Sequence, residues 1–158
     1  MRLSPHHSIT IILLTALLFF TGCEKGTVIH RYQPTPIEGW EKDDTISFST
    51  DTIKNDGTYN LSIGIRNTSE YRYVDLWLIV KSRFCNPIYE RTDTIKCIIN
   101  NYDADIGSTG IFVHNHIYPI PPLKLKKGQT GVISINHYMH NRSLKGISDL
   151  GIHMENKQ

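Results

Sequence analysis

Histidine is the residue type whose spacing in this chain comes nearest to a site of chemistry. His114 and His116 are one residue apart, so a strand would place both imidazoles on one face, about 7 Å from each other. His137 would have to join them from a neighbouring strand before a metal ion gained three ligands. Histidines on a solvated strand face are usually ordinary polar residues. We therefore predict no metal site.

Other catalytic patterns are also missing from the sequence. It contains no GxSxG, HExxH or phosphate-binding loop, which are the motifs that would place a nucleophile, a zinc ion or a nucleotide. Asp43 and Asp44 are adjacent, so a strand would turn their carboxylates to opposite faces. Asp103 and Asp105 are close in sequence only. The sequence predicts no enzyme and no cofactor.

Cys23 carries the clearest chemical signal. The apolar run from Ile9 to Phe20 precedes it, and this run is too short for a permanent membrane span, which needs about 20 residues. Thr21 and Gly22 before Cys23 resemble the bacterial lipobox. We predict that residues 1–22 are a lipoprotein signal peptide and that acylated Cys23 binds the lipid bilayer. The alternative is an ordinary secretory peptide that is cleaved nearby.

Lipidation would place the chain in the cell envelope, anchored to the inner or the outer membrane. Glu24, Lys25 and Gly26 do not form the acidic run that would mark surface export. We therefore expect the protein to face the periplasm. In that oxidising compartment Cys85 and Cys97 form an even pair, which makes them a candidate disulfide that closes a loop of about a dozen residues. The alternative is two separate buried thiols.

The composition limits the partners. The 158 residues include 17 Lys and Arg against 15 Asp and Glu, which is too little charge asymmetry for binding to a nucleic-acid backbone. With 39% hydrophobic, 20% charged and 9% aromatic residues, the chain is neither a disordered acidic tail nor a coiled coil. The composition fits one globular domain with its own core.

The hydrophobic pattern predicts strands. Alternation is clear at residues 45–49 and 59–65, and the continuous apolar run at 76–80 is typical of a central strand. Further candidates are residues 93–99, 111–117, 130–137 and 149–154. The prolines at 119, 121 and 122 lack amide donors, so residues 118–123 should form an edge or crossing segment. Trp40 and Trp77 both fall at positions that we expect to face inward.

These strands predict an all-β fold. We expect a single antiparallel β-sandwich of about seven to eight strands, with at most one short helix near residues 138–144. The domain would span residues 40–158. Residues 23–39 contain Pro34 and Pro36 with little periodicity, so they should form a lipidated tether.

An ordered set of motifs resembles one protein family. Tyr32, Trp40, the stretch 44–48 and the stretch 65–78 are similar to the GldH family of gliding motility lipoproteins of the Bacteroidetes. The segment from Tyr138 to Ile152 adds the family's C-terminal signature, so the resemblance covers most of residues 30–155. It departs from the family at Tyr71 to Asp75, at residues 101–107 and at His140.

The resemblance implies an envelope lipoprotein that takes part in gliding and in the type IX secretion context, without catalytic activity or cofactor. Function would then depend on a surface that contacts other envelope proteins of that machinery. Tyrosine and arginine supply contact energy at low entropic cost, so the candidate surface comprises Tyr71, Arg72, Tyr73, Tyr138 and Arg142. The alternatives are that Tyr71 and Tyr73 brace a corner of the sandwich, or that the protein binds a glycan or another small ligand.

Three Asp-Thr-Ile triplets resemble the acceptor motif of O-glycosylation in the Bacteroidetes. Their threonines are Thr45, Thr52 and Thr94. Alternation would turn Thr45 outward when Ile46 faces the core, which permits modification. The alternative is ordinary strand composition, which is rich in threonine and isoleucine.

Overall fold

The computed structural model describes residues 26–99 and 113–157. The predicted signal peptide and Cys23 lie outside the described residues, as do Asp103, Asp105 and the first residues of the predicted 111–117 strand.

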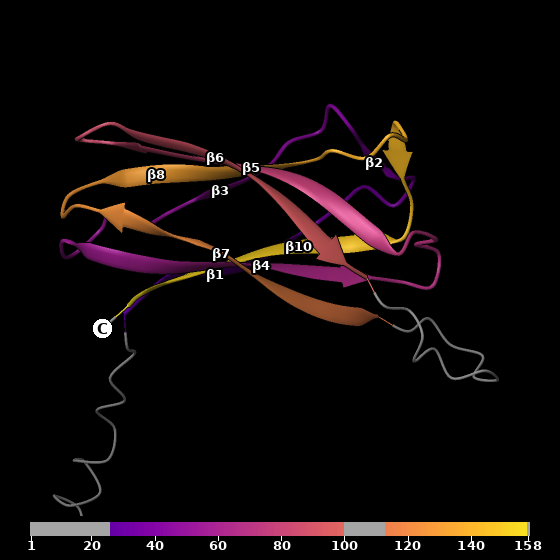
Figure 1. The fold of residues 1–158 in the computed structure, drawn as a ribbon, viewed down its shortest axis with the longest axis horizontal. Helices are drawn as coiled ribbons and strands as arrows, with labels where there is room; N and C mark the ends of the chain where they lie inside the picture. The colour runs from indigo at the N-terminus through magenta and orange to yellow at the C-terminus, as the bar shows by residue number, and fades with distance from the viewer. Residues whose placement is uncertain (1–25, 100–112, 158) are drawn as a thin grey trace, which may run out of the picture.

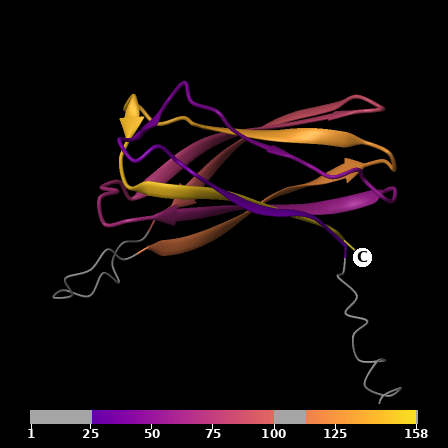
Figure 2. The same cartoon turned by 180° about the vertical axis from the view of Figure 1, so that it is seen from behind.

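Two four-stranded antiparallel sheets pack face to face (Figures 1 and 2). The first has the order β1-β10-β4-β7 and the second the order β3-β8-β5-β6, while β2 and β9 form a small separate pair. The first sheet consists of β1 (Thr27–Pro34), β10 (Ile147–Asn156), β4 (Gly57–Asn67) and β7 (His114–Leu125). The second consists of β3 (Ile46–Ser49), β8 (Thr130–His137), β5 (Asp75–Cys85) and β6 (Tyr89–Ile98). The short pair is β2 (Trp40–Glu41) and β9 (Ser143–Leu144).

The predicted all-β sandwich is confirmed. Eight strands of four or more residues lie in the described part of the chain, and every paired strand runs antiparallel to its neighbour. Alternation explains the core: Leu61, Ile63 and Ile65 on β4 face inward against the equally buried Leu78 and Val80 of β5, because every second side chain of a strand points to the same face.

Residues 138–144, where the prediction allowed at most one short helix, form no helix. This segment leaves β8 as a loop and ends in β9, and none of the described residues is helical. Met139 and Leu144 turn into the core, while the intervening residues 140–143 are exposed. The two buried positions are five residues apart, whereas a helix would bury residues three or four apart. Within the described ranges, no helix has the length and apolarity that a membrane span requires.

The predicted boundary between tether and domain at residue 40 is wrong. Strand β1 begins at Thr27 and pairs with β10 along its length, from Thr27 opposite Glu155 to Pro34 opposite Asp149. Ile29 is buried, and the Gln33 side chain donates a hydrogen bond to the Ser47 carbonyl of the other sheet, at 2.8 Å. The sandwich therefore begins at Thr27, which is thirteen residues before the predicted start at residue 40.

The proline-rich segment lies at a sheet edge, as predicted. Strand β7 is the last strand of its sheet, and the Arg91 guanidinium on β6 donates hydrogen bonds to the carbonyls of Pro121 and Pro122, at 2.5 and 2.7 Å. The Tyr118 hydroxyl donates to the Ile98 carbonyl. These side-chain contacts join the two sheets along one side without a backbone ladder.

Candidate functional site

The structure separates the three predicted histidines. His114 and His116 are half-buried on the inward side of β7, whereas His137 is fully buried on β8 of the other sheet. Desolvation and then the neighbouring His114 lower the pKa of His116. Among residues 26–99 and 113–157, no three His, Cys, Asp or Glu side chains form a group that would hold a metal ion.

His137 has a structural role. Its Nε2 lies 3.1 Å from the Trp40 carbonyl oxygen, and its ring meets the Trp40 indole edge to face, with centroids 5.1 Å apart. A carbonyl can only accept, so Nε2 donates. Desolvation lowers the pKa of this imidazole, although the hydrogen bond to Trp40 opposes that shift. His137 therefore fastens the β2 segment to β8 in its neutral form.

The predicted bridge between Cys85 and Cys97 does not form. Both cysteines are free, with Cys85 exposed and Cys97 buried. Cys97 pairs with Leu76, and Cys85 lies nine positions after Leu76 on the same strand, which is about 30 Å at the rise of a strand. A disulfide needs Cα atoms within about 7 Å. Burial also raises the pKa of the Cys97 thiol to about 12.

Tyr71, predicted as part of an interaction surface, is a core residue. Only 1% of its surface is exposed, and its hydroxyl donates a 2.7 Å hydrogen bond to the Asp75 carbonyl. The Tyr73 ring packs edge to face against it, with centroids 5.5 Å apart. Burial, followed by the charge of Asp75, raises the pKa of Tyr71. The alternative that these two tyrosines brace a corner is the one that the structure supports for Tyr71.

The other predicted surface residues lie at the end of the sandwich opposite the start of β1 (Figure 1). Arg72 is exposed and Tyr73 is half-buried, and both line a 570 Å³ open cavity together with Ser69, Glu70, Ser143 and Lys145. Arg142 is exposed, and its Nε lies 3.6 Å from the Glu41 carboxylate. Tyr138 is 59% exposed.

Trp77, which we expected to face inward, lies on the outer face of the second sheet. It is 37% exposed on β5, opposite Lys96 of β6, whose ammonium sits 5.5 Å from the ring centroid. Tyr138 lies directly across the other edge of β5, since its amide donates to the Trp77 carbonyl at 2.7 Å. Ile98, 47% exposed, is the diagonal neighbour on β6. We call Trp77, Ile98 and Tyr138 the Trp77 patch.

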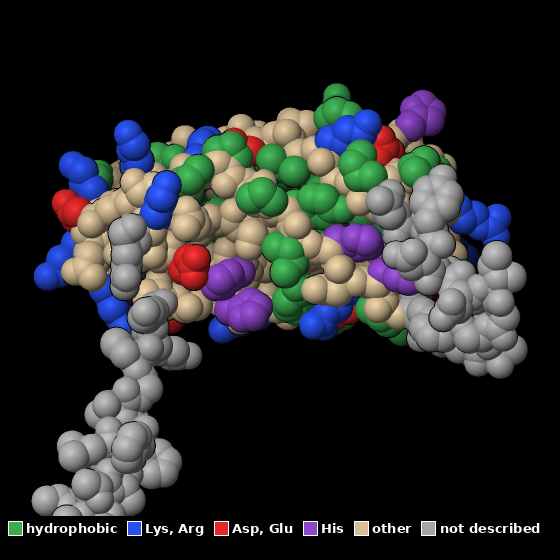
Figure 3. Space-filling model, turned by 60° about the horizontal axis from the view of Figure 1, so that its bottom comes forward, with side chains coloured by type: hydrophobic (Ala, Val, Ile, Leu, Met, Phe, Trp, Pro, Cys, Tyr) green, Lys and Arg blue, Asp and Glu red, His purple; other side chains and the backbone are tan. Residues whose placement is uncertain are grey.

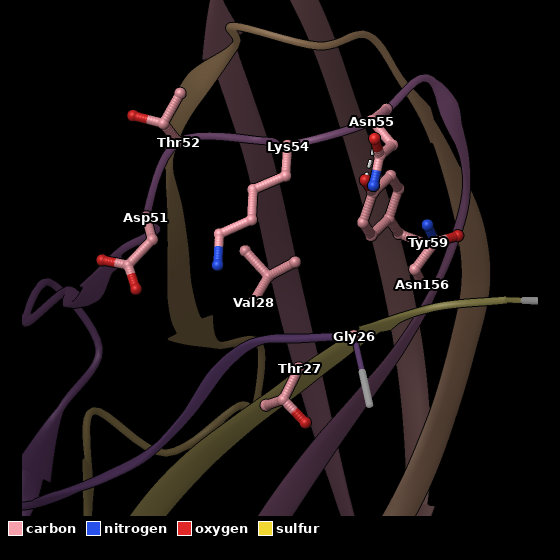
Figure 4. Close-up of a pocket in the computed structure, with 9 residues that line it drawn as sticks. All are labelled: Gly26, Thr27, Val28, Asp51, Thr52, Lys54, Asn55, Tyr59 and Asn156. Carbon is pink, nitrogen blue, oxygen red and sulfur yellow. Dashed lines mark hydrogen bonds between the residues drawn. The ribbon is translucent and has the colours of Figure 1, made fainter. Parts of the chain in front are cut away.

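A second cavity, of about 330 Å³, lies at the opposite end, where β1 begins (Figure 4). Gly26, Thr27 and Val28 form one wall, and the loop from Asp51 to Asn55 forms the other. The Tyr59 hydroxyl donates to the Asn55 carbonyl at 2.7 Å and closes the inner side. The Lys54 side chain points into the space between the two walls (Figure 4).

The three candidate threonines all lie on the surface. Thr45, Thr52 and Thr94 are exposed, while Ile46 and Ile53 that follow the first two are buried. The Asn136 amide donates to the Thr45 hydroxyl at 2.7 Å, so that hydroxyl keeps its own proton. Each aspartate that precedes a candidate threonine is exposed or half-buried.

Comparisons with known proteins extend over the whole sandwich. The family model described as GldH lipoprotein matches residues 27–154. A Christiangramia forsetii protein called "Gliding motility lipoprotein GldH homolog" is 38% identical over 77 residues, which span 49% of this chain and 46% of that protein, so the matched stretch covers about half of that relative. The Flavobacterium johnsoniae protein "Gliding motility lipoprotein GldH" is 25% identical over 154 residues, or 93% of this chain and 95% of its own length.

Among solved structures, a chain called "Family 16 Carbohydrate Binding Module-2" overlaps 74% of this chain and 70% of its own, with a TM-score of 0.24 and 9% identity. That likeness is too weak to say anything about ligands. The family match, by contrast, begins at the first residue of β1 and ends within β10, so it covers the sandwich from its first strand to its last. The chain belongs to the GldH lipoprotein family.

Proposed function

We propose that this protein is a non-catalytic envelope lipoprotein that is anchored through acylated Cys23 and contacts another envelope protein of the gliding or type IX secretion machinery. The family and the names of the relatives support the envelope and motility context. The relatives' names describe gliding motility lipoproteins and mention no enzyme.

The Trp77 patch carries the proposal for a protein contact. Trp77 on β5, Ile98 on β6 and Tyr138 directly after β8 are exposed side by side, and aromatic residues of this kind dominate binding energy at protein interfaces. The Lys42 ammonium lies 5.6 Å from the Tyr138 ring centroid, and Lys96 forms a 3.2 Å ion pair with Asp75. An apolar centre with a charged rim is the usual anatomy of a protein interface.

Photo-crosslinking in the native host tests this assignment. A photoreactive amino acid in place of Trp77 or Tyr138 should give an adduct with an envelope protein, identified by mass spectrometry. Ile117 is the matched control, because it is 64% exposed on the outer side of the other sheet. Adducts that form equally from position 117, or from none of the three positions, would contradict the proposal.

A further inference from the structure

We propose that the end of the sandwich where β1 begins docks on the headgroups of an anionic phospholipid bilayer. This inference rests on the proposed lipidation of Cys23. It adds a second membrane contact, made by the folded domain itself, and it therefore fixes how the domain stands on the membrane.

The early start of the sandwich brings this end close to the bilayer. Only Glu24, Lys25 and Gly26 separate Cys23 from Thr27, the first residue of β1. Four residue steps reach at most about 14 Å. A tether up to residue 39 would have allowed roughly four times that distance, so the position of β1 is what limits the domain to the neighbourhood of the headgroups.

Lysines gather at this end. Lys54 lies in the loop before β4, and Lys124, Lys126 and Lys127 lie at the end of β7 and in the turn that follows. Lys157 follows β10, and its backbone amide donates to the Thr58 carbonyl at 2.8 Å, which places it beside the start of β4. All five are exposed. Figure 3 shows several Lys and Arg side chains at the end that corresponds to the start of β1, and others at the opposite end.

Few carboxylates oppose these lysines. Asp51 and Asp56 lie in the same loops, and one Asp56 oxygen accepts a 2.8 Å hydrogen bond from the Lys127 amide. Glu155 lies near the end of β10, and its carboxylate oxygen is 3.8 Å from Nε2 of His153. Five lysines therefore exceed the three carboxylates by two charges, and none of the five forms an ion pair with a described residue.

The opposite end differs. There Lys96 pairs with Asp75 at 3.2 Å and Arg142 with Glu41 at 3.6 Å, and the exposed Arg72 and Lys145 line one cavity with Glu70. At the end next to the lipid anchor, by contrast, five exposed lysines have no ion pair with a described residue. Basic residues that lie beside a membrane are attracted to anionic headgroups within about one Debye length, roughly 8 Å at physiological salt. Docking of this end keeps the Trp77 patch distant from the bilayer, because Trp77 lies near the start of β5 and the docked end lies at the end of β5.

Energy transfer in vesicles tests the docking. The lipidated protein is reconstituted into vesicles of phosphatidylcholine, with or without phosphatidylglycerol, that carry a headgroup acceptor dye. Cys85 takes the donor dye, because it is exposed at the same end of the sandwich while Cys97 is buried. We expect transfer to rise when phosphatidylglycerol is present and to return to the phosphatidylcholine level in about 1 M salt, where the Debye length is about 3 Å.

Charge variants locate the contact. The triple variant Lys54→Gln, Lys126→Gln, Lys127→Gln should lose the increase in transfer that phosphatidylglycerol causes. The matched control is Arg72→Gln, Arg142→Gln, Lys145→Gln, which removes the same charge from exposed positions at the opposite end and should keep the increase. Equal transfer in both lipids, or the same loss in both variants, overturns the docking alone. A chain that does not float with the vesicles contradicts lipidation and removes both proposals.

Discussion

The ring of Tyr32 on β1 lies across the backbone of Gly64, two strands away on β4. Gly151 of β10 stands between them in the same row of the sheet. A Cβ atom on Gly64 would lie 2.1 Å from the Tyr32 hydroxyl oxygen, and one on Gly151 would lie 2.6 Å from the ring. The Arg66 guanidinium sits 4.1 Å from the ring centroid. The tyrosine thus fills the space that the two glycines leave and holds the edge strand to its sheet.

This contact predicts strong coupling between the two positions. Tyr32→Ala should lower the free energy of unfolding by about 2 kcal/mol, because the backbone at Gly64 and Gly151 then loses the ring that covers it and faces water. Gly64→Ala should cost about 1 kcal/mol while Tyr32 is present, since the ring must move. In the Tyr32→Ala background the same change should be neutral or stabilising, because alanine suits a strand better than glycine.

Denaturant unfolding of both single variants and the double variant measures this coupling. If the two single costs add up in the double variant, Tyr32 does not occupy the space above Gly64, and the explanation for the attachment of β1 fails.

Most of the sandwich could be predicted from the sequence, because apolar and polar residues alternate clearly wherever one face of a strand is exposed to solvent. It missed β1 for a physical reason. Tyr32 covers glycines on the outer face instead of entering the core, so β1 shows little alternation, and Pro34 and Pro36 looked like a linker. Trp77 was placed inward because its neighbours Leu76 and Leu78 are apolar. An exposed tryptophan in such a run leaves no periodic signal.

The candidate surface was harder to predict than the fold. Tyr71 and Tyr138 are the same residue type, yet one is buried and the other exposed. The difference arises from the loop that brings Gly146 against the Tyr71 backbone, a contact between residues 75 positions apart along the chain. The disulfide prediction failed for a related reason: spacing in sequence does not reveal that β5 and β6 form a long hairpin with Cys85 near its turn.

Gly146 should tolerate no side chain. Its φ is +82°, and a Cβ would lie 2.1 Å from the Tyr71 amide nitrogen, a backbone atom that cannot rotate away. Gly146→Ala should therefore destabilise the fold by about 3 kcal/mol, through backbone strain and displacement of the Tyr71 turn. Thermal unfolding measures the loss.

Gly128→Ala is the control for backbone strain. Gly128 has a φ of +90°, with no atom near the added Cβ, so its cost should be about 1 kcal/mol. Equal costs at both positions would show that the Tyr71 contact contributes nothing.

The two cysteines should differ in reactivity. In the folded, lipidated protein one thiol should react rapidly with a disulfide reagent at neutral pH, because Cys85 is exposed and Cys97 is buried with a pKa of about 12. A second thiol should appear on unfolding. Cys85→Ser should abolish the rapid reaction only. The absence of both thiols after unfolding would indicate that a bridge forms after all.

Acid should destabilise the protein through the buried His137 and the half-buried His116. The folded-state pKa of His137 is lowered from its ordinary value of 6.5, so the unfolded chain binds a proton more readily. The contribution of neutral His137 to the free energy of unfolding is therefore complete above the pKa of histidine in the unfolded chain. It is lost as the pH falls below about 6.5. Urea unfolding at a series of pH values between about 8 and 5 should show that the free energy of unfolding declines as the pH falls.

His137→Gln separates this residue from the other histidines. Glutamine can still donate to the Trp40 carbonyl but does not titrate, so the variant should show a smaller decline in stability below pH 6.5. His116, whose pKa is also lowered, should account for part of what remains. An unchanged pH dependence in the variant would contradict the role assigned to His137.

The exposed Asp-Thr-Ile triplets predict O-linked sugar on the protein from its own host. A transferase must reach the hydroxyl group, and the structure leaves Thr45, Thr52 and Thr94 exposed. Intact-mass spectrometry should show a mass above that of the lipidated chain, and replacement of all three threonines by alanine should remove the excess. Protein made in a bacterial cytoplasm that lacks the transferase supplies the unmodified reference. Because the hydroxyl of Thr45 also receives a hydrogen bond from Asn136, Thr52 and Thr94 should carry more of the sugar. A native mass equal to that of the lipidated chain would exclude modification at all three sites.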